Sequence, residues 1–323
     1  MTPLPFNMPV MQFLVGHRTV PLTEFFLGVT SLGTFNIYIL LVTLIYVAWN
    51  KQLAIRVSVL LLLTSSLNGL LKLMIRNPRP FVSDGSYLKK WAVSADTARG
   101  LAMEYSTPSG HAMSASAFYS YLYAVMGNRY AKVMAVAAIF LIGFSRPYLG
   151  VHYVEDVLLG WALGLGCALV SLRYADAIGA RWGRFSHGEQ IGIALAGSVL
   201  LWLFSLAANG GRAGGESMGF LADGGFLTGI VIARRLELRT VNFNPRSSTA
   251  VVKMLRYLLT IGMVTGTLLI LDKGFGMVSG RVGTLGFMLA YVRFAAVGFV
   301  NFYVAPLAFT RIGWAETVPA PEN

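Results

Sequence analysis

Residues 130–173 read YAKVMAVAAIFLIGFSRPYLGVHYVEDVLLGWALGLGCALVSLR, and this stretch decides the class of the fold. Two apolar runs, 130–147 and 152–173, are each long enough to cross a bilayer as a helix. The short turn between them carries an arginine and a histidine, and a carboxylate follows within one helical turn. Ionisable groups are costly beside hydrocarbon and tend to mark functional sites. The stretch therefore predicts two membrane helices with a polar site at their junction.

The whole chain has the composition of a membrane protein. Its 323 residues are 55% hydrophobic and 12% charged, with a mean hydropathy of +0.63. A soluble protein carries roughly twice that share of charge. The net charge of +12 comes from cations in short loops between apolar runs, which favours a membrane topology over a nucleic-acid-binding face. The single cysteine, Cys167, predicts neither a disulfide framework nor a cysteine metal site.

Apolar runs recur along the chain and predict an all-α fold, a polytopic transmembrane helical bundle of about nine spans. The predicted spans are 30–49, 54–76, 110–127, 130–147, 152–173, 190–208, 217–233, 254–272 and 284–308. Prolines interrupt residues 1–29, which we expect to lie at the membrane interface, and we expect no cleavable signal peptide. The predicted domains are this segment, a motif-bearing core over 30–175, and a four-span bundle with a C-terminal tail over 176–323.

Three short motifs place polar side chains at the ends of these spans. They are Lys72-x6-Arg79-Pro80, Pro108-Ser109-Gly110-His111 and Ser145-Arg146-x5-His152-x3-Asp156. In the second motif, Ser109 is a good N-cap for the span 110–127, and Gly110 lets the backbone approach a ligand. A helix N-terminus offers unpaired N–H groups and the positive end of a dipole, so this junction predicts an anion site beside His111.

The third motif pairs a histidine with a carboxylate one helical turn later. A carboxylate at i+4 can accept a hydrogen bond from the imidazole Nδ1–H, which leaves Nε2 as a nucleophile. A lone pair such as His152 and Asp156 is more often structural than catalytic, so the other two motifs decide its interpretation. All three together supply fixed cations, a helix start, two histidines and one carboxylate, an inventory suited to binding and transferring a phosphoryl group. The chain offers no Asp/Glu/His cluster as a metal cage, so we predict neither a metal nor a cofactor.

In their order and internal spacing, the three motifs resemble the signature of the type-2 phosphatidic acid phosphatase superfamily. The resemblance covers roughly residues 68–160, and every motif position agrees. This superfamily includes bacterial membrane phosphatases of lipid phosphates, sphingosine-phosphate phosphatases, glucose-6-phosphatases and soluble vanadium haloperoxidases. The predicted nine-span layout is similar to the glucose-6-phosphatase and sphingosine-phosphate phosphatase branches.

The resemblance implies a role for each motif residue. His152 is expected to attack phosphorus and form a phosphohistidine, and Asp156 is expected to orient it. His111 is expected to protonate the leaving oxygen and then to activate water. The phosphate oxygens are expected to be held by Lys72, Arg79, Ser109, Gly110 and Arg146.

The distribution of lysine and arginine predicts the orientation. Loops on one side of the predicted bundle are richer in these residues, which places that side in the cytoplasm and all three motifs on the outer face. On the outer side, the predicted loop 77–109 contains Tyr87, Lys89, Lys90 and Trp91, which would either bind a lipid headgroup or lie on the membrane surface.

We therefore predict a metal-independent integral membrane phosphatase that hydrolyses a lipid phosphate or diphosphate at the outer face. We place it in a bacterial inner membrane with the active site facing the periplasm. Its predicted partners are membrane lipids and the lipid substrate, without nucleic acid, and the oligomeric state stays open. The alternatives are a lipid phosphotransferase that uses the same intermediate, a sugar-phosphate phosphatase, and a non-enzymatic transporter or scaffold.

Overall fold

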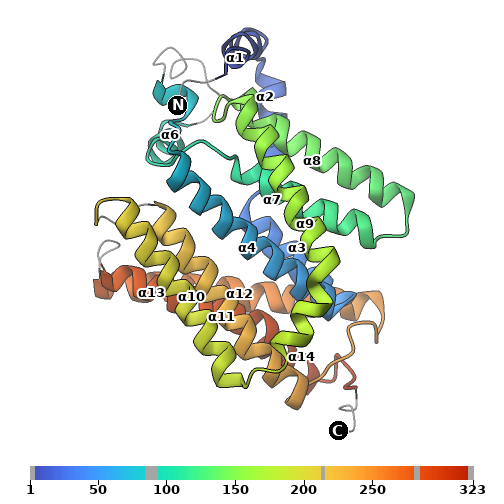
Figure 1. Ribbon diagram of the computed structural model, residues 1–323. Helices are drawn as coiled ribbons and strands as arrows, with labels where there is room; N and C mark the ends of the chain where they lie inside the picture. The colour runs from blue at the N-terminus through green and yellow to red at the C-terminus, as the bar shows by residue number, and fades with distance from the viewer. Residues whose placement is uncertain (1–3, 84–93, 212–214, 280–283, 319–323) are drawn as a thin grey trace. The chain divides into compact units, whose positions relative to one another are not determined.

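The described part of the chain is helical, as Figure 1 shows for the computed structural model. The structure describes residues 4–83, 94–211, 215–279 and 284–318. Over these ranges the pairing of Phe243 with Thr317 is an isolated β-bridge, and no strand is formed. The all-α prediction is confirmed. The loop residues Tyr87, Lys89, Lys90 and Trp91 lie outside the described residues.

Each predicted span coincides with a helix or a helical run. The helices are α1 (Asn7–Gly16), α2 (Val20–Ser31), α3 (Phe35–Ala48), α4 (Lys51–Ile75), α5 (Pro80–Ser83), α6 (Ala95–Ala102), α7 (Gly110–Val125), α8 (Arg129–Leu149), α9 (Val154–Trp182), α10 (His187–Ala208), α11 (Gly215–Thr240), α12 (Ala250–Ser279), α13 (Thr284–Phe299) and α14 (Ala305–Arg311). A π-helical turn, η2 (Val300–Val304), joins α13 to α14. The prolines in residues 1–29 do not prevent helix formation, because Pro21 falls in the first turn of α2, where its missing N–H has no intrahelical partner to lose.

Length and hydropathy test the number of spans among the described residues. Six segments are long and apolar enough to cross a membrane: Lys51–Val82, Arg129–Leu149, Val154–Trp182, His187–Ala208, Ala250–Gly276 and Leu285–Arg311. Helices α2 and α3, which are bent by 53° at their junction, meet the same length and hydropathy criteria only as a pair and would then form a seventh span. Helix α7 has 16 residues, fewer than the roughly 20 that a bilayer requires. The membrane class is confirmed, whereas the count of nine stays a prediction.

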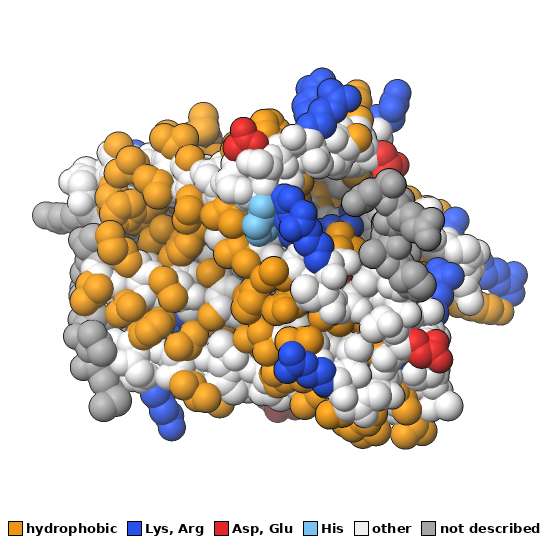
Figure 2. Space-filling model, turned by 90° about the horizontal axis from the view of Figure 1, so that it is seen from below, with side chains coloured by type: hydrophobic (Ala, Val, Ile, Leu, Met, Phe, Trp, Pro, Cys, Tyr) orange, Lys and Arg blue, Asp and Glu red, His pale blue; other side chains and the backbone are white. Residues whose placement is uncertain are grey.

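Large apolar side chains lie on the surface of these helices. Exposed examples include Val133, Phe140, Leu200 and Ile270, with relative exposures between 54% and 71%. Figure 2 shows hydrophobic side chains spread widely over the face that it draws. Soluble monomers rarely expose contiguous apolar patches larger than a few hundred Å². This surface is therefore suited to contact with lipid.

The chain divides into two compact units. The first comprises Met1–Tyr38, Leu63–Ala175 and Ala208–Glu216, and the second comprises Ile39–Leu62, Asp176–Ala207 and Ser217–Asn323. Helices α3, α4 and α9 contribute residues to both units. All three motifs belong to the first unit, together with the N-terminal helices α1 and α2. The domain boundaries predicted after residues 29 and 175 stay predictions.

Close helix packing in the first unit positions the motif residues. A Cβ added at Gly160 would lie 2.9 Å from the Ser109 carbonyl oxygen, and one at Gly164 would overlap the carbonyl of Met113. Only glycine therefore lets α9 approach the start of α7 this closely. On the other side, Phe26 of α2 packs against Tyr148 at the end of α8, with ring centroids 4.4 Å apart.

The second unit has its own buried polar contacts. The side chain of Glu237 is 1% exposed and accepts a hydrogen bond from Lys51 Nζ at 2.7 Å. Thr43 donates to Asn301 Oδ1 at 2.8 Å, and Tyr46 donates to the carbonyl of Phe302 at 3.0 Å. These bonds tie the chain segment 39–62 to the last helices inside this unit.

Candidate active site

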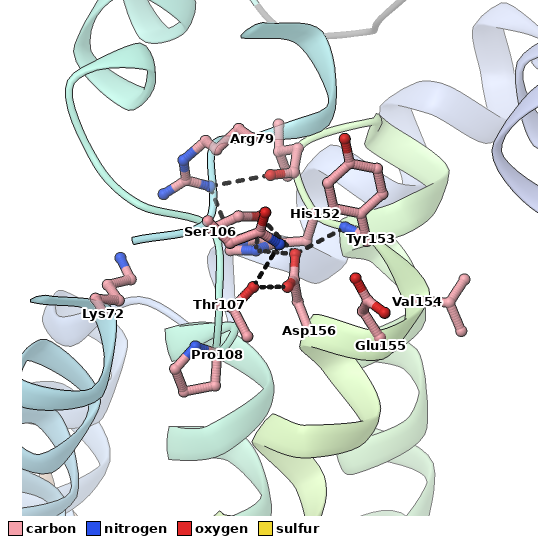
Figure 3. A network of polar contacts seen from close by, with 12 residues as sticks. Lys72, Arg79, Ser106, Thr107, Pro108, His152, Tyr153, Val154, Glu155 and Asp156 are labelled. Carbon is pink, nitrogen blue, oxygen red and sulfur yellow. Dashed lines mark hydrogen bonds and ion pairs between the residues drawn. The ribbon is translucent and has the colours of Figure 1, made fainter. Parts of the chain in front are cut away.

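The three motifs meet in the first unit, where six of the eight predicted site residues are buried. Figure 3 shows part of this network of polar contacts. Lys72 lies on α4, Arg79 precedes α5, His111 lies in the first turn of α7, Arg146 is near the end of α8, and α9 begins two residues after His152. The relative exposures are 8% for Lys72, 2% for Arg79, 0% for Ser109, 5% for Arg146, 2% for His152 and 0% for Asp156. The sequence thus places five charged or titratable side chains and a serine out of contact with bulk solvent.

The turn between α8 and α9 delivers His152 to the site. Helix α8 ends at Leu149, and Gly150 follows with φ of 78°, in the left-handed region that glycine enters without strain. The N–H of Gly150 donates to the Pro147 carbonyl at 3.0 Å, and the N–H of Val151 donates to the Arg146 carbonyl at 3.1 Å. These bonds end α8 and reverse the direction of the chain. Only this short turn therefore separates Arg146 from His152.

The Nε2 atom of His152 faces a guanidinium group. Arg79 Nη1 lies 3.0 Å from His152 Nε2 and also donates to the Val151 carbonyl at 3.0 Å (Figure 3). Arginine can only donate, so Nε2 must be the acceptor and must carry a lone pair. The ring proton therefore belongs on Nδ1, which is the tautomer that a nucleophilic Nε2 requires.

Asp156 holds the other side of the imidazole. Its Oδ2 atom lies 3.3 Å from His152 Nδ1 and accepts a bond from the backbone N–H of Tyr153 at 2.8 Å. The hydroxyl of Ser106 donates to the same Oδ2, and that of Thr107 donates to Oδ1. Ser106 Oγ is also 3.3 Å from His152 Nδ1. The carboxylate is thus anchored by several donors, which restricts its movement relative to the ring.

Ser106 and Thr107 were not among the site residues predicted from the sequence. The sequence signal that could have identified them is their position directly before the second motif. Asn77, two residues before Arg79, fixes them in place: its carbonyl accepts from Ser106 N at 2.7 Å, and its Nδ2 donates to Thr107 Oγ1 at 2.9 Å. These bonds join the end of the first motif to the start of the second and direct both hydroxyls toward Asp156.

The surroundings of His152 favour its neutral form. Burial lowers the pKa of this imidazole well below its usual value, and the positive charges of Arg79, Arg146 and Lys72 lower it further. The ring is therefore uncharged at neutral pH, with its lone pair available at Nε2.

The start of α7 has the properties of an anion-binding site. Ser109 stands at the N-cap position in extended conformation, but its side chain makes no capping bond. Its hydroxyl is buried and has no hydrogen-bond partner among the described residues. A Cβ added at the next residue, Gly110, would lie 3.2 Å from Asn68 Oδ1, so the backbone is closely packed there. An uncapped N-terminus with a buried hydroxyl suits a phosphate oxygen.

A carboxylate outside the motifs bridges two of the cations. Glu104 Oε2 lies 2.9 Å from Arg79 Nη2 and 3.3 Å from Lys72 Nζ. Its side chain is 40% exposed, whereas that of Arg79 is 2% exposed. Burial raises the pKa of Glu104, but the charges of Lys72 and Arg79 outweigh burial, and the net effect lowers the pKa. Glu104 is therefore ionised at neutral pH and competes with any anion for these two cations.

The N-terminal segment also reaches the motif residues. Arg146 Nη1 donates to the hydroxyl of Thr30 on α2. A Cβ added at Gly33, between α2 and α3, would lie 3.1 Å from His111 Cδ2 and 2.7 Å from Ile142 Cγ2. His111 is therefore packed against the α2–α3 junction. Sequence analysis assigned neither Thr30 nor Gly33 to the site.

Within the described ranges, no group of three or more His, Cys, Asp or Glu side chains could hold a metal ion. The positive charge at this site comes from Lys72, Arg79 and Arg146. Together with the start of α7 they can bind an anion of two negative charges, and His152 offers a neutral nucleophile beside it.

Two family models match this chain. Residues 53–179 match the model described as the PAP2 superfamily, and residues 221–317 match the model described as the PAP2 superfamily phosphatase, transmembrane extension. The first range contains all eight predicted site residues. These matches confirm the resemblance inferred from the three motifs.

Curated relatives match over part of the chain. The chain is 27% identical over 154 residues to lipid phosphate phosphatase delta of Arabidopsis thaliana, covering 45% of this chain and 36% of that protein. It is 37% identical over 70 residues to phosphatidylglycerophosphatase B of Bacillus subtilis (strain 168), covering 19% and 34%. The chain spans about a third of the length of the curated relatives it matches. Among solved structures, a transmembrane PAP2-type phosphatidylglycerolphosphate phosphatase from Bacillus subtilis aligns with a TM-score of 0.44 and 24% identity, over 53% of this chain and 85% of that one.

Proposed function

We propose that this chain is a member of the PAP2 superfamily and an integral membrane phosphatase that hydrolyses a lipid phosphate or diphosphate through a phosphohistidine. One observation carries the proposal. His152 Nε2 faces Arg79 Nη1 at 3.0 Å, while Asp156 holds the opposite nitrogen of the same ring. A buried neutral imidazole whose lone pair points at a phosphate-binding cation is placed to attack a phosphorus atom bound there.

The first half-reaction transfers the phosphoryl group to the enzyme. The lone pair of His152 Nε2 forms a bond to phosphorus as the ester P–O bond breaks, and His111 gives a proton to the departing oxygen. The imidazole becomes positively charged in this step, and the Asp156 carboxylate at Nδ1 stabilises that charge.

The second half-reaction returns the enzyme to its starting state. His111, now unprotonated, takes a proton from a water molecule whose oxygen attacks phosphorus. The P–N bond to His152 breaks, and inorganic phosphate leaves. In both steps, Lys72, Arg79 and Arg146 stabilise the charge on the equatorial oxygens, the usual means of catalysis in phosphoryl transfer.

The position of the site in the fold favours an amphiphilic substrate. The motif residues lie at the ends of apolar helices, so a lipid can enter from the bilayer while its phosphate reaches the polar end. The names of the relatives, a lipid phosphate phosphatase and a phosphatidylglycerophosphatase, agree with this substrate class. We assign catalysis to the core over 30–175 and place the site on the outer face of a bacterial inner membrane, toward the periplasm, from the positive-inside bias.

A substrate panel tests this function. Purified full-length protein in lipid vesicles is assayed for inorganic phosphate release from phosphatidic acid, phosphatidylglycerol phosphate, polyprenyl diphosphate, sphingosine phosphate and glucose-6-phosphate. We expect turnover of at least one lipid, undiminished by EDTA and inhibited by vanadate, which mimics the transition state. A preference for glucose-6-phosphate would mean that the substrate is a sugar phosphate and not a lipid phosphate. Label transfer to an added lipid hydroxyl, without phosphate release, would make the protein a phosphotransferase. Inactivity on the whole panel would overturn the proposal.

Cysteine labelling tests the orientation. In a Cys167→Ala background, Met103→Cys lies near the site at an exposed position, and Arg246→Cys lies in the loop between α11 and α12. An impermeant maleimide applied to intact cells with a permeabilised outer membrane should label the first and miss the second. The reverse pattern would place the active site in the cytoplasm.

A further inference from the structure

Helix α9, which follows the nucleophile, begins without a cap from its own sequence. The first N–H groups of any helix have no intrahelical acceptor and need one from elsewhere. The side chains that usually supply it belong to Ser, Thr, Asp or Asn at the residue before the helix, and here that residue is Tyr153. The N–H of Tyr153 itself donates to Asp156 Oδ2 at 2.8 Å. The amides of Val154 and Glu155 still require an acceptor.

Asn7 of α1 provides that acceptor from the other end of the chain. Its Oδ1 accepts from Val154 N at 3.1 Å and from Glu155 N at 3.4 Å, across about 147 residues of sequence. The Asn7 side chain is fully buried, with a relative exposure of 0%. One amide oxygen therefore performs, for α9, the task that an N-cap side chain usually performs.

The surroundings of Asn7 hold it in this position. One turn later on α1, Met11 is 0% exposed and packs in a cluster with Phe81 and Tyr153. The backbone N–H of Leu4 donates to Glu155 Oε2 at 3.3 Å. Phe81 follows Arg79 by two residues, so the same cluster supports the cation that faces His152. Helix α1 thus covers the turn that presents the nucleophile.

We propose that Asn7 is a positioning residue for His152 and acts through the N-terminus of α9. Without this acceptor the first turn of α9 frays, and His152 and Asp156 shift together relative to the cations on α4 and α8. Rates depend steeply on such shifts, because a misplacement of about 1 Å can slow a reaction roughly 100-fold. Asn7 lies outside residues 53–179, the range that matches the PAP2 superfamily model. The inference rests on the proposed function for its kinetic readout.

Three variants of the full chain separate positioning from general stability. Asn7→Ala removes the acceptor, and Asn7→Asp keeps an oxygen at the same position. Asn301→Ala is the matched control, because the Asn301 side chain is also buried and its Oδ1 accepts a hydrogen bond, from Thr43, inside the second unit. For each protein we measure kcat, KM, the melting temperature and the affinities for vanadate and for inorganic phosphate.

Asn7→Ala should lower kcat by about 10- to 100-fold, with KM and phosphate affinity unchanged within about twofold, since the cations lie on other elements. Vanadate affinity should fall with kcat, because vanadate bonds to Nε2 of His152. Asn7→Asp should recover most of kcat. Asn301→Ala should lower the melting temperature by a comparable amount and keep kcat close to that of the wild type.

Other outcomes would overturn the inference. If kcat falls in proportion to melting temperature in both alanine variants, Asn7 is merely structural. If Asn7→Asp stays as slow as Asn7→Ala, the acceptor is not the cause. If Asn7→Ala fails to fold, the comparison of Asn7→Asp with the wild type decides the matter: a folded Asn7→Asp protein that is about 10- to 100-fold slower would contradict the inference. If Asn7→Ala is as active as the wild type, the positioning role of Asn7 is refuted, whereas the proposed function is not. If the wild type is inactive on every substrate, the proposed function is refuted. The vanadate affinities of Asn7→Ala and the wild type would still test the positioning role of Asn7.

Discussion

Helices α7 and α9 both begin at the site, and the protein treats their first turns differently. At α9, Asn7 Oδ1 accepts two amides, and Asp156 accepts the N–H of Tyr153. At α7, Ser109 occupies the N-cap position but makes no capping bond, and its hydroxyl has no partner among the described residues. The start of α9, beside the nucleophile, is capped by groups of the protein. The start of α7 stays available to a ligand.

This difference separates two requirements of phosphoryl transfer. A nucleophile needs a fixed direction of attack, and a capped helix start supplies rigidity worth about 1 kcal/mol. An anion site needs donors that other protein groups do not already satisfy, although a buried hydroxyl without a partner costs about 1–3 kcal/mol. The unpaired hydroxyl of Ser109 is therefore expected only if a bound anion offsets this free-energy cost. We therefore expect substitutions at the two helix starts to change different kinetic constants.

The largest effect should come from the nucleophile beside α9. His152→Ala removes the imidazole whose Nε2 lone pair faces Arg79, so turnover should fall by more than about 10³-fold. Inorganic phosphate should still bind, because the cations remain. The assay compares steady-state phosphate release with phosphate binding in the same preparation. Activity above a few per cent of wild type would remove His152 from this role.

The next effect concerns His111 at the start of α7. As a general acid it should contribute about 10²–10⁴-fold on a lipid phosphate, and His111→Ala should lose that factor. On a substrate with a good leaving group, such as p-nitrophenyl phosphate, the loss in the first half-reaction should be much smaller. Trapping of a labelled phosphoenzyme measures this step directly. Equal losses on both substrates would contradict the division of labour between the two histidines.

An intermediate effect is expected at Ser109. A hydrogen bond to a charged group contributes about 1.5–3 kcal/mol, so Ser109→Ala should weaken substrate binding by roughly 10- to 150-fold. Its melting temperature should not fall, since the hydroxyl has no hydrogen-bond partner to lose among the residues that the structure describes. Asn7→Ala should show the opposite pattern, with a lower kcat and a lower melting temperature. Ser109→Ala losing stability while keeping KM would mean that the hydroxyl serves packing.

Local patterns in the sequence predicted the chemistry of both helix starts. The spacing of His152 and Asp156 places them one turn apart, as the structure has them. Ser109, as an N-cap residue, indicated where α7 begins. Each of these signals lies within a few residues of the feature that it predicts.

The supporting contacts were not predictable in this way. Asn7 meets Val154 across 147 residues, and Arg146 meets Thr30 across 116. An isolated asparagine or threonine near the N-terminus carries no pattern that would identify such a partner. Glu104 lies only a few residues before the second motif, but whether a loop carboxylate faces solvent or the cations depends on how the loop folds. The number of membrane crossings is equally undecided by pattern, because α7 is apolar but has only 16 residues.

The smallest effect should come from Glu104, whose carboxylate bridges two of the cations. Its carboxylate bonds Lys72 and Arg79, so a substrate phosphate must displace it from both. Because the side chain is 40% exposed, solvent screens this pair, and an exposed ion pair contributes about 0.2–1 kcal/mol. Glu104→Gln should therefore lower KM and the inhibition constant of phosphate by roughly 1.5- to 5-fold, with kcat little changed.

The pH dependence of phosphate inhibition distinguishes competition by Glu104 from a change in packing. The pKa of Glu104 is lowered, so its charge persists at neutral pH and is lost only as the pH falls through that lowered pKa. The wild type should then approach the phosphate affinity of Glu104→Gln at acid pH, and the two should diverge as the pH rises. Glu104→Asp keeps the charge and serves as the control, with affinities close to wild type. A constant ratio between wild type and Glu104→Gln across this range, or weaker phosphate binding in the glutamine variant, would show that Glu104 does not compete with the substrate.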